Sequence, residues 1–246
     1  MKDMDNVRFT EAYNKVIMNN QKKHGIGTLS EKSLHAIIKN YLEPDEQKQE
    51  IKIGKNYADI YNEEGIIEIQ TKQFNKLRNK LTEFLKNYKV TVVYPIAFNK
   101  WLYWVNDETA EVSKGRKSPK TGTVYDAFFE LYKIKKFLNN DNLKLKIILL
   151  DVEEYRYLNG WSKDKKKGSH CMDRIPKRVE KEINICTIDD YKKLIPKGLS
   201  NEFTSKDFAK QANIKIEKAQ LTLNILYEVQ AVKRIGKKGR SYLYTV

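Results

Sequence analysis

Residues 57–74 have the sequence YADIYNEEGIIEIQTKQF, two segments rich in β-branched and aromatic residues that are separated by a polar turn. Asn62 and Gly65 suit the first and last positions of a type I turn, so the stretch predicts a tight hairpin. Acids stand on both arms, at Asp59 and Glu68, where a sheet favours apolar side chains. Folding alone does not account for carboxylates at these two positions.

A four-residue turn over 62–65 pairs residues whose numbers sum to 127, which places Asp59 opposite Glu68 with their Cβ atoms roughly 5 Å apart. Side chains alternate along a strand, so Gln70 projects on the side of Glu68 and the isoleucines between them face the core. Two carboxylates this close repel each other unless a cation, a proton or an arginine joins them. A hard cation such as Mg²⁺ prefers such oxygen ligands and would activate a water against a phosphodiester. The alternative is that the acids lie on a solvated outer face of the hairpin.

The segments around the hairpin predict an α/β domain. Apolar residues at helical spacing predict one helix between Ser30 and Pro44 and another over 74–88. Strands are predicted over 49–54 and over 90–97, the second as a continuous apolar run typical of a strand covered on both faces. From the first of these helices onward, the predicted order is therefore α-β-β-β-α-β.

The pattern changes near residue 198. Between residue 98 and residue 198, we expect a second hairpin over 100–115, a helix over 124–138 and a buried strand from residue 144. Residues 161–178 have seven Lys/Arg against two Asp and no periodicity, so they predict a surface loop. After residue 198, two short helices precede two strands around GKKGR, which is the order of elements in a winged helix-turn-helix. The predicted domains are an N-terminal extension (1–27), a main domain (28–198) and a winged helix-turn-helix domain (199–246).

The composition favours a polyanionic partner. Lys and Arg number 47 against 32 Asp and Glu, a formal net charge of +15, and nucleic acid is the commonest partner of such a chain. The alternative is a lysine-rich background composition. The chain has no apolar run long enough for a membrane span and no signal peptide, so we expect a cytoplasmic protein. Cys171 and Cys186 form no paired CxxC, which argues against a disulfide framework or a structural zinc site.

The order α-β-β-β-α-β, with Asp on the second strand and a variant of Glu-x-Lys on the third, resembles the PD-(D/E)XK (restriction-endonuclease-like) nuclease superfamily. The matching residues are Asp59 and the EIQ of Glu68, Ile69 and Gln70, within roughly residues 28–97. The resemblance implies a mixed central sheet and hydrolysis of DNA phosphodiesters with Mg²⁺ or Mn²⁺, held by Asp59, Glu68 and the main-chain carbonyl of Ile69. A homodimer is a candidate assembly, because many nucleases of this fold pair up to cut both strands.

The resemblance also implies a role for Glu31 on the first helix, with His35 one turn later on the same side. The lysine of the superfamily is Gln70 here, which can orient a water but carries no charge. Some members have glutamine at this position, and Lys72 would partly substitute if the strand continues. A non-catalytic DNA-binding or regulatory protein on a nuclease-like scaffold is the main alternative, and an RNA-processing nuclease is a third.

Basic residues gather in three segments and predict contacts to duplex DNA. The predicted ribbon VKRIGKKGRSYLYTV has five cations and no acid in 15 residues, and its tip suits phosphate contact. Lysines near the start of the preceding helix would grip phosphate, and Gln220 can read an adenine edge. The alternatives are plain soluble loops and a winged helix that binds protein. The predicted contacts are Lys114, Arg116, Lys117 and Lys120, then Lys163, Lys165, Lys166 and Lys167, then Ser205, Lys206, Lys215, Lys218, Gln220, Lys233, Arg234, Lys237, Lys238 and Arg240, with Thr222 and Asn224 also on the second helix.

Overall fold

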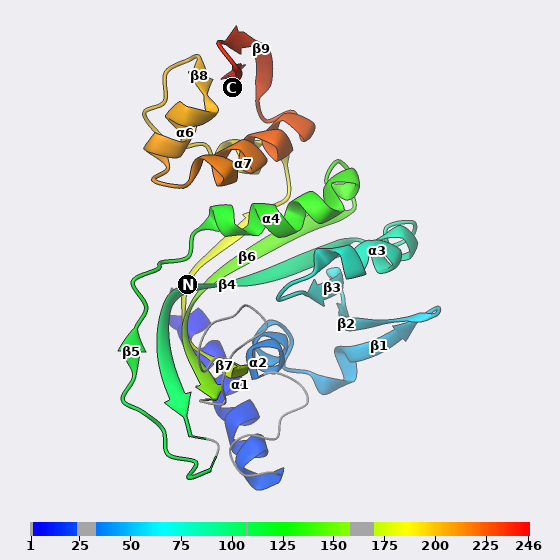
Figure 1. The fold of residues 1–246 in the computed structure, drawn as a ribbon. Helices are drawn as coiled ribbons and strands as arrows, with labels where there is room; N and C mark the ends of the chain where they lie inside the picture. The colour runs from blue at the N-terminus through cyan, green and yellow to red at the C-terminus, as the bar shows by residue number, and fades with distance from the viewer. Residues whose placement is uncertain (1, 24–32, 107, 158–169) are drawn as a thin grey trace. The chain divides into compact units, whose positions relative to one another are not determined.

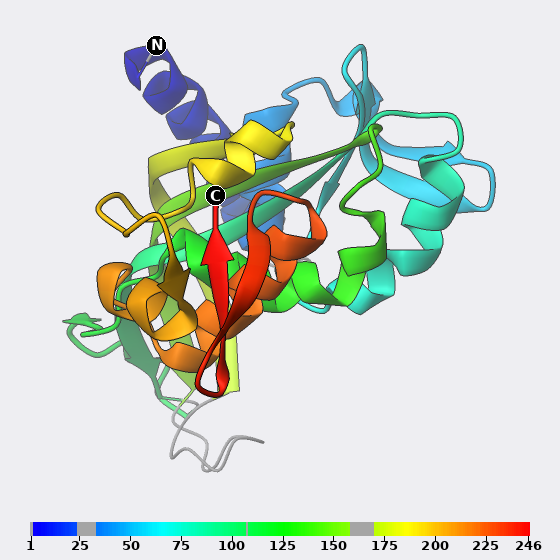
Figure 2. The same ribbon diagram turned by 90° about the horizontal axis from the view of Figure 1, so that it is seen from above.

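The computed structural model describes residues 2–23, 33–106, 108–157 and 170–246 (Figures 1 and 2). The chain divides into two compact units, each assembled from three segments of the sequence. Unit 1 comprises Met1–Tyr61, Pro95–Gly122 and Ile148–Glu182, and unit 2 comprises Asn62–Tyr94, Thr123–Ile147 and Ile183–Val246. Residues 199–246, predicted as a separate domain, therefore group with two earlier segments.

A mixed sheet has the strand order β1-β2-β3-β4-β6-β7, with β5 paired to β4 (Figure 1). In β1 and β2, which are antiparallel, Ile51 lies opposite Ala58, whereas β3 runs parallel to β4 with Glu68 opposite Val92. The mixed α/β class and the mixed central sheet are thus confirmed. The strands are β1 (Gln49–Ile53), β2 (Asn56–Asn62), β3 (Gly65–Ile69), β4 (Val90–Val105), β5 (Arg116–Lys117), β6 (Leu143–Tyr157) and β7 (His170–Ile185).

The helices of unit 1 are α1 (Lys2–Lys23), α2 (Ser33–Leu42) and the 3₁₀ turn η1 (Glu46–Lys48). Leu34, Ile37 and Ile38 of α2 are buried, as their spacing predicts, and α2 ends two residues before Pro44. The beginning of the predicted helix, from residue 30 to residue 32, lies outside the described residues. At the first described turn of α2, the carboxylate of Asp173 on β7 accepts hydrogen bonds from the main chain and the hydroxyl of Ser33, at 3.2 and 2.5 Å.

In unit 2, the helix predicted over 74–88 is shorter than expected and begins as a 3₁₀ turn. The segment predicted as one helix over 124–138 consists of three short pieces, with Ile134 at non-helical φ and ψ of −114° and 18°. The elements are η2 (Phe74–Leu77), α3 (Arg78–Phe84), η3 (Val124–Ala127), α4 (Phe128–Leu131), η4 (Tyr132–Phe137), α5 (Ile188–Lys192), α6 (Ser205–Gln211) and α7 (Ile216–Glu228). Among the helices of the described ranges, none is both long and apolar enough to cross a membrane.

The second predicted hairpin is present, but its regular strand pairing lies further from the turn than predicted. Strand β4 continues without interruption from Val90 to Val105, and Val112 makes only an isolated bridge to Val105. Ala110 has a left-handed φ of 58°, which breaks the extended conformation that a return strand needs. Further along the same return arm, β5 pairs with β4 in the antiparallel direction, and Lys117 lies opposite Trp101.

The prediction of a surface loop over 161–178 is wrong for residues 170–178, which form the first half of β7. Residues 158–169 lie outside the described residues. This strand stands at the end of the sheet order, where an edge position tolerates Pro176. Its charged side chains pair with acids of β6, as Arg174 does with Glu154 at 2.8 Å. Apolar and polar residues do not alternate regularly along β7, so the sequence pattern did not predict a strand here.

The C-terminal elements of unit 2 match the predicted order. Strands β8 (Phe203–Thr204), β9 (Lys233–Lys238) and β10 (Ser241–Thr245) form an antiparallel sheet in the order β8-β10-β9. Thr204 caps α6, and Asp207 completes the capping box. Phe208 meets Tyr125 edge-on at 5.7 Å between ring centroids, and Lys218 forms an ion pair with Asp126, so these elements pack against η3.

Gly65 is required where the hairpin turn enters β3. Its φ is +110°, and a Cβ atom there would lie 2.4 Å from the carbonyl oxygen of Lys89. We expect Gly65→Ala to lower the free energy of unfolding by at least about 2 kcal/mol, because backbone strain and a backbone clash add together. The melting temperature should fall by about 5 °C or more. Gly236→Ala is the control, since its Cβ meets no atom within 4 Å; an equal change in both variants would contradict this role of Gly65.

Candidate active site

The turn of the hairpin forms as predicted. Strand β2 ends at Asn62 and β3 begins at Gly65, and the side-chain oxygen of Asn62 accepts a hydrogen bond from the main chain of Glu64 at 3.1 Å. Glu63 and Glu64 are exposed. The two acids of the turn are therefore exposed to solvent, unlike Asp59 and Glu68 on the strands.

Glu68 is buried in β3, with only 1% of its surface exposed. Ile67 and Ile69 are buried on either side of it, as predicted, and the strand is covered on both faces. The interpretation of a solvated outer face is therefore wrong for Glu68. Taking an ionised carboxylate out of water is costly, so such a group needs a cationic partner and hydrogen bonds.

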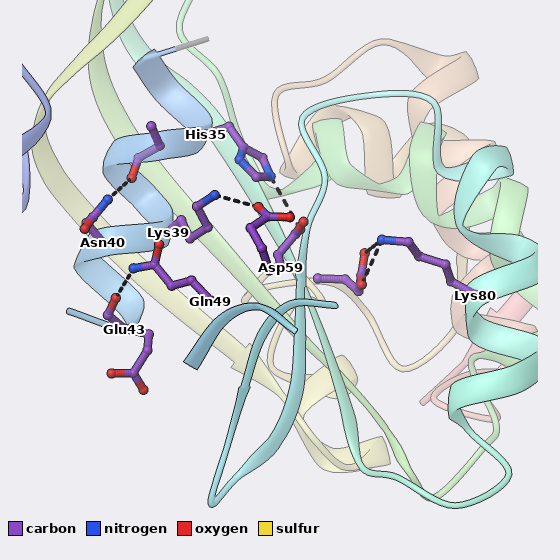
Figure 3. A network of polar contacts seen from close by, with 10 residues as sticks. His35, Lys39, Asn40, Glu43, Gln49, Asp59 and Lys80 are labelled. Carbon is purple, nitrogen blue, oxygen red and sulfur yellow. Dashed lines mark hydrogen bonds and ion pairs between the residues drawn. The ribbon is translucent and has the colours of Figure 1, made fainter. Parts of the chain in front are cut away.

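Lys80 of α3 is that partner. Its ammonium donates to both carboxylate oxygens of Glu68, at 3.1 Å to Oε1 and 2.9 Å to Oε2 (Figure 3). The side chain of Lys80 is 28% exposed against 2% for Glu68, so the lysine connects a buried charge to the surface. Sequence reasoning missed Lys80, although it directly precedes the buried Leu81 on the helix that connects the parallel strands β3 and β4.

The contacts described around Asp59 come from elements of unit 1. Nε2 of His35 lies 3.4 Å from Oδ2 of Asp59, and Figure 3 shows His35 and Lys39 projecting from α2 toward this region. The register of β1 and β2 places Glu50 opposite Asp59, and Glu50 accepts a hydrogen bond from Lys39 at 2.6 Å. His35 and Lys39 are one helical turn apart and share a side of α2. Unit 1 thus gathers two carboxylates, an imidazole and an ammonium.

Glu50 itself has an unusual backbone, with a left-handed φ of 51° inside β1. Such a conformation is uncommon for residues other than glycine and costs of order 1–3 kcal/mol. From this position Glu50 forms its ion pair with Lys39, whose side chain is buried.

The remaining predicted residues lie beyond the end of β3. The main chain of Gln70 donates to Val93 at 2.9 Å, and its side-chain amide donates to the carbonyl of Lys72. Lys72 is exposed and lies three residues after Ile69, the last residue of β3, so the strand does not continue far enough to meet the condition for its predicted role. The chain leaves the sheet here and reaches a left-handed φ of 61° at Gln73 before η2 begins. Glu31 lies outside the described residues.

The candidate metal ligands have the right chemistry, since carboxylate and carbonyl oxygens are what Mg²⁺ and Mn²⁺ bind. Asp59 belongs to unit 1 and Glu68 to unit 2, so the predicted pairing of these two carboxylates stays a prediction. Within the described ranges, no group of three or more His, Cys, Asp and Glu side chains is placed to hold a metal ion. A cation that binds Glu68 would compete with the ammonium of Lys80, which contacts both carboxylate oxygens.

Comparison with known proteins shows the family. Residues 32–186 match a family described as a domain of unknown function (DUF8091), which is more than half of the chain. The chain belongs to this family. An uncharacterized protein of Treponema pallidum (strain Nichols) is 28% identical over 150 residues, which are 61% of this chain and 59% of that protein. The chain thus spans about three fifths of that relative's length, and no solved structure matches.

The DUF8091 domain includes α2 and all seven strands of the mixed sheet, and therefore both Asp59 and Glu68. The basic loop predicted to contact DNA also lies inside it. Its four cations are exposed, and Lys117 stacks over Trp101 at 5.4 Å. The exposed residues are Lys114, Arg116, Lys117 and Lys120, whereas Lys163, Lys165, Lys166 and Lys167 lie outside the described residues.

The C-terminal basic residues lie beyond the DUF8091 domain and divide into two groups. The guanidinium of Arg234 stacks between Tyr227 and Tyr242, 4.1 and 4.2 Å from the ring centroids, and so attaches β9 to α7 and β10. Lys218 is engaged by Asp126, and Ser205 and Thr222 are buried, so Thr222 does not face a ligand as predicted. The exposed members are Lys206, Lys215, Gln220, Lys233, Lys237, Lys238 and Arg240.

Proposed function

We propose that this chain is a divalent-metal-dependent DNA endonuclease of the PD-(D/E)XK type, with a C-terminal winged helix that binds duplex DNA. The observation that carries the proposal is Glu68, a carboxylate buried to 1% exposure in a strand of isoleucines and paired with Lys80. A strand in this position is more stable with an apolar residue, so chemistry is a better reason for the acid than folding.

The arrangement of elements supports the proposal. An antiparallel pair, β1 and β2, precedes β3, and β3 is joined through α3 to the parallel strand β4. Asp59 stands on the second of these strands and Glu68 on the third. The resemblance to the superfamily implies this order of elements within a mixed sheet.

In the proposed mechanism, Asp59, Glu68 and the carbonyl of Ile69 would hold Mg²⁺ or Mn²⁺. The bound metal would act as a Lewis acid on the phosphodiester and lower the pKa of the attacking water. Lys80 supplies the positive charge that Gln70 lacks, and this charge stabilises the negative charge that develops on the phosphate. His35, at 3.4 Å from Asp59, orients that carboxylate.

A non-catalytic DNA-binding scaffold is the second candidate, and one observation favours it. The ammonium of Lys80 donates to both oxygens of Glu68 and so neutralises the carboxylate without a metal. In this alternative, Lys80 is a permanent counter-ion. The exposed cations of β9 and of the basic loop then account for the binding of DNA.

Titration calorimetry with Mn²⁺ on the full chain separates the two candidates. The nuclease proposal predicts binding that Asp59→Asn removes, because the substitution keeps the size of the side chain and takes away its charge. Asp45→Asn, an exposed acid that caps η1, is the control and should bind as the parent does. Absence of Mn²⁺ binding by the parent chain would contradict the nuclease and favour the scaffold. Incubating plasmid, linear, branched and single-stranded DNA with Mg²⁺ or Mn²⁺ then identifies the substrate.

A further inference from the structure

Three cations converge on one buried carboxylate in unit 1, at Glu154 of β6. Nε of Arg156 lies 2.5 Å from Oε1, whereas Nε of Arg174 and Nζ of Lys100 lie 2.8 and 3.3 Å from Oε2. These side chains come from β4, β6 and β7, which are neighbours in the sheet. The side chain of Glu154 is fully buried, whereas the exposed fractions are 27% for Lys100, 21% for Arg156 and 40% for Arg174.

The cations exceed what the carboxylate needs. One carboxylate and three cations carry a summed charge of +2. Two guanidiniums and an ammonium offer about 13 N–H donors, whereas a carboxylate accepts about four. A single arginine would compensate a buried carboxylate, so Glu154 does not need all three cations.

The acid next to Glu154 does not remove this surplus. Side chains alternate along a strand, so Glu153 projects to the opposite face of the sheet from Glu154 and Arg156. There it accepts hydrogen bonds from the hydroxyls of Tyr103 and Tyr155, at 3.3 and 3.1 Å.

Around Asp151, on the same strand, acids outnumber cations. It accepts a hydrogen bond from Arg178 at 3.1 Å, but Arg178 also forms an ion pair with Glu180, so two acids share one guanidinium. The excess of cations is therefore a property of the Glu154 cluster rather than of strand β6 as a whole.

Glu154 holds the cations in place. Burial on its own raises the pKa of Glu154, but the charges of Arg174 and Lys100, with hydrogen bonds from Arg174 and Arg156, outweigh it and lower the pKa to about 2. The carboxylate is thus ionised at neutral pH. Because it anchors both arginines through Nε, their guanidinium planes are fixed before any ligand arrives, which lowers the entropic cost of binding.

We propose that Lys100, Arg156 and Arg174 form a phosphate-binding site that contacts the backbone of a nucleic acid. The guanidinium fork matches the geometry of phosphate oxygens, and arginine is favoured for such recognition. The surplus charge of the cluster suits a phosphate diester, which is a singly charged anion. The identification of DNA as the owner of the phosphate rests on the proposed function, whereas the anion site itself rests on the cluster.

The test removes the surplus and leaves Glu154 compensated. In the double variant Lys100→Met/Arg174→Met, Arg156 still pairs with Glu154, so the sheet should remain folded by circular dichroism. The control is Lys86→Met/Lys192→Met, which removes the same charge from exposed pairs with Glu83 and Asp189. Binding of a short fluorescent DNA duplex is measured over a range of salt concentrations in EDTA, so that the metal chemistry plays no part.

The double variant is expected to bind the duplex at least tenfold more weakly, and the slope of log affinity against log salt should fall by about 2. The control should bind within about twofold of the parent chain. If the parent binds the duplex and the variant binds equally well with the same salt slope, the inference is overturned. If the parent binds inorganic phosphate but not the duplex, and the variant loses that phosphate binding, the anion site stands and DNA as its ligand is overturned. If the parent binds neither, both are overturned.

Discussion

Glu68→Gln and Asp59→Asn are each expected to reduce metal-dependent nicking of supercoiled plasmid by a factor of about 10³ or more, which is about 4 kcal/mol of transition-state stabilisation. Each substitution keeps the shape of the side chain and replaces an anionic metal ligand with a neutral amide. Nicking is measured with Mg²⁺ or Mn²⁺ and compared with EDTA. The loss should appear in the rate of cleavage, because DNA binding depends on cations elsewhere.

The turn of the same hairpin supplies the matched controls. Glu63→Gln and Glu64→Gln make the same chemical change at exposed positions and should leave nicking unchanged. Glu68→Gln should also remain folded, because Lys80 is 28% exposed and can be hydrated once its partner is neutral. Parent-like cleavage by both Asp59→Asn and Glu68→Gln would disprove the assignment of the active site.

Periodicity identified the elements whose apolar residues face one core. Helically spaced apolar residues are buried in α2, as Ile37 and Ile38 are, and in α7, as Leu223 and Leu226 are, and β4 begins as a continuous apolar run. Periodicity failed for β7, because an edge strand can satisfy its charged side chains against a neighbouring strand. It also failed for the end of β3, where Gln70 bonds to the carbonyl of Lys72 and the chain turns away from the sheet. Local hydrogen bonds of this kind leave no periodic signal.

The candidate site was predictable only in part. Asp59 and Glu68 were identifiable because acids are out of place among β-branched residues. Lys80 was not, since a lysine on an amphipathic helix usually faces solvent, and only tertiary packing aims it at Glu68. The same is true of Lys100 and Arg174, which are far apart in the sequence and meet at Glu154 through the sheet. Clusters of basic residues along the sequence therefore predicted DNA contacts in loops. The cations that pair with the buried Glu154 lie on strands instead.

Lys80→Met is expected to lower the free energy of unfolding of the metal-free protein by about 3 kcal/mol, because it breaks a buried ion pair. The charge left behind is that of Glu68, whose side chain is 2% exposed. Urea unfolding monitored by fluorescence measures the loss. Lys86→Met, on the turn after α3, is the control; its pair with Glu83 is exposed on both sides, so the change should stay below about 0.5 kcal/mol. Lys80→Met/Glu68→Leu should recover most of the lost stability, since an apolar pair replaces the ionic one.

The response of Lys80→Met to metal then decides between an enzyme and a scaffold. Lys80 occupies both oxygens of Glu68, so its removal opens that carboxylate to a cation. If Glu68 is a metal ligand, Mn²⁺ should bind Lys80→Met about tenfold more tightly than the parent and restore the lost stability by mass action. Cleavage should nevertheless fall by about 10², because the charge that Gln70 cannot provide is gone. Loss of stability that Mn²⁺ does not restore would instead identify Lys80 as the permanent counter-ion of a scaffold. A lysine that competes with the metal and yet assists the reaction is the outcome that only the nuclease predicts.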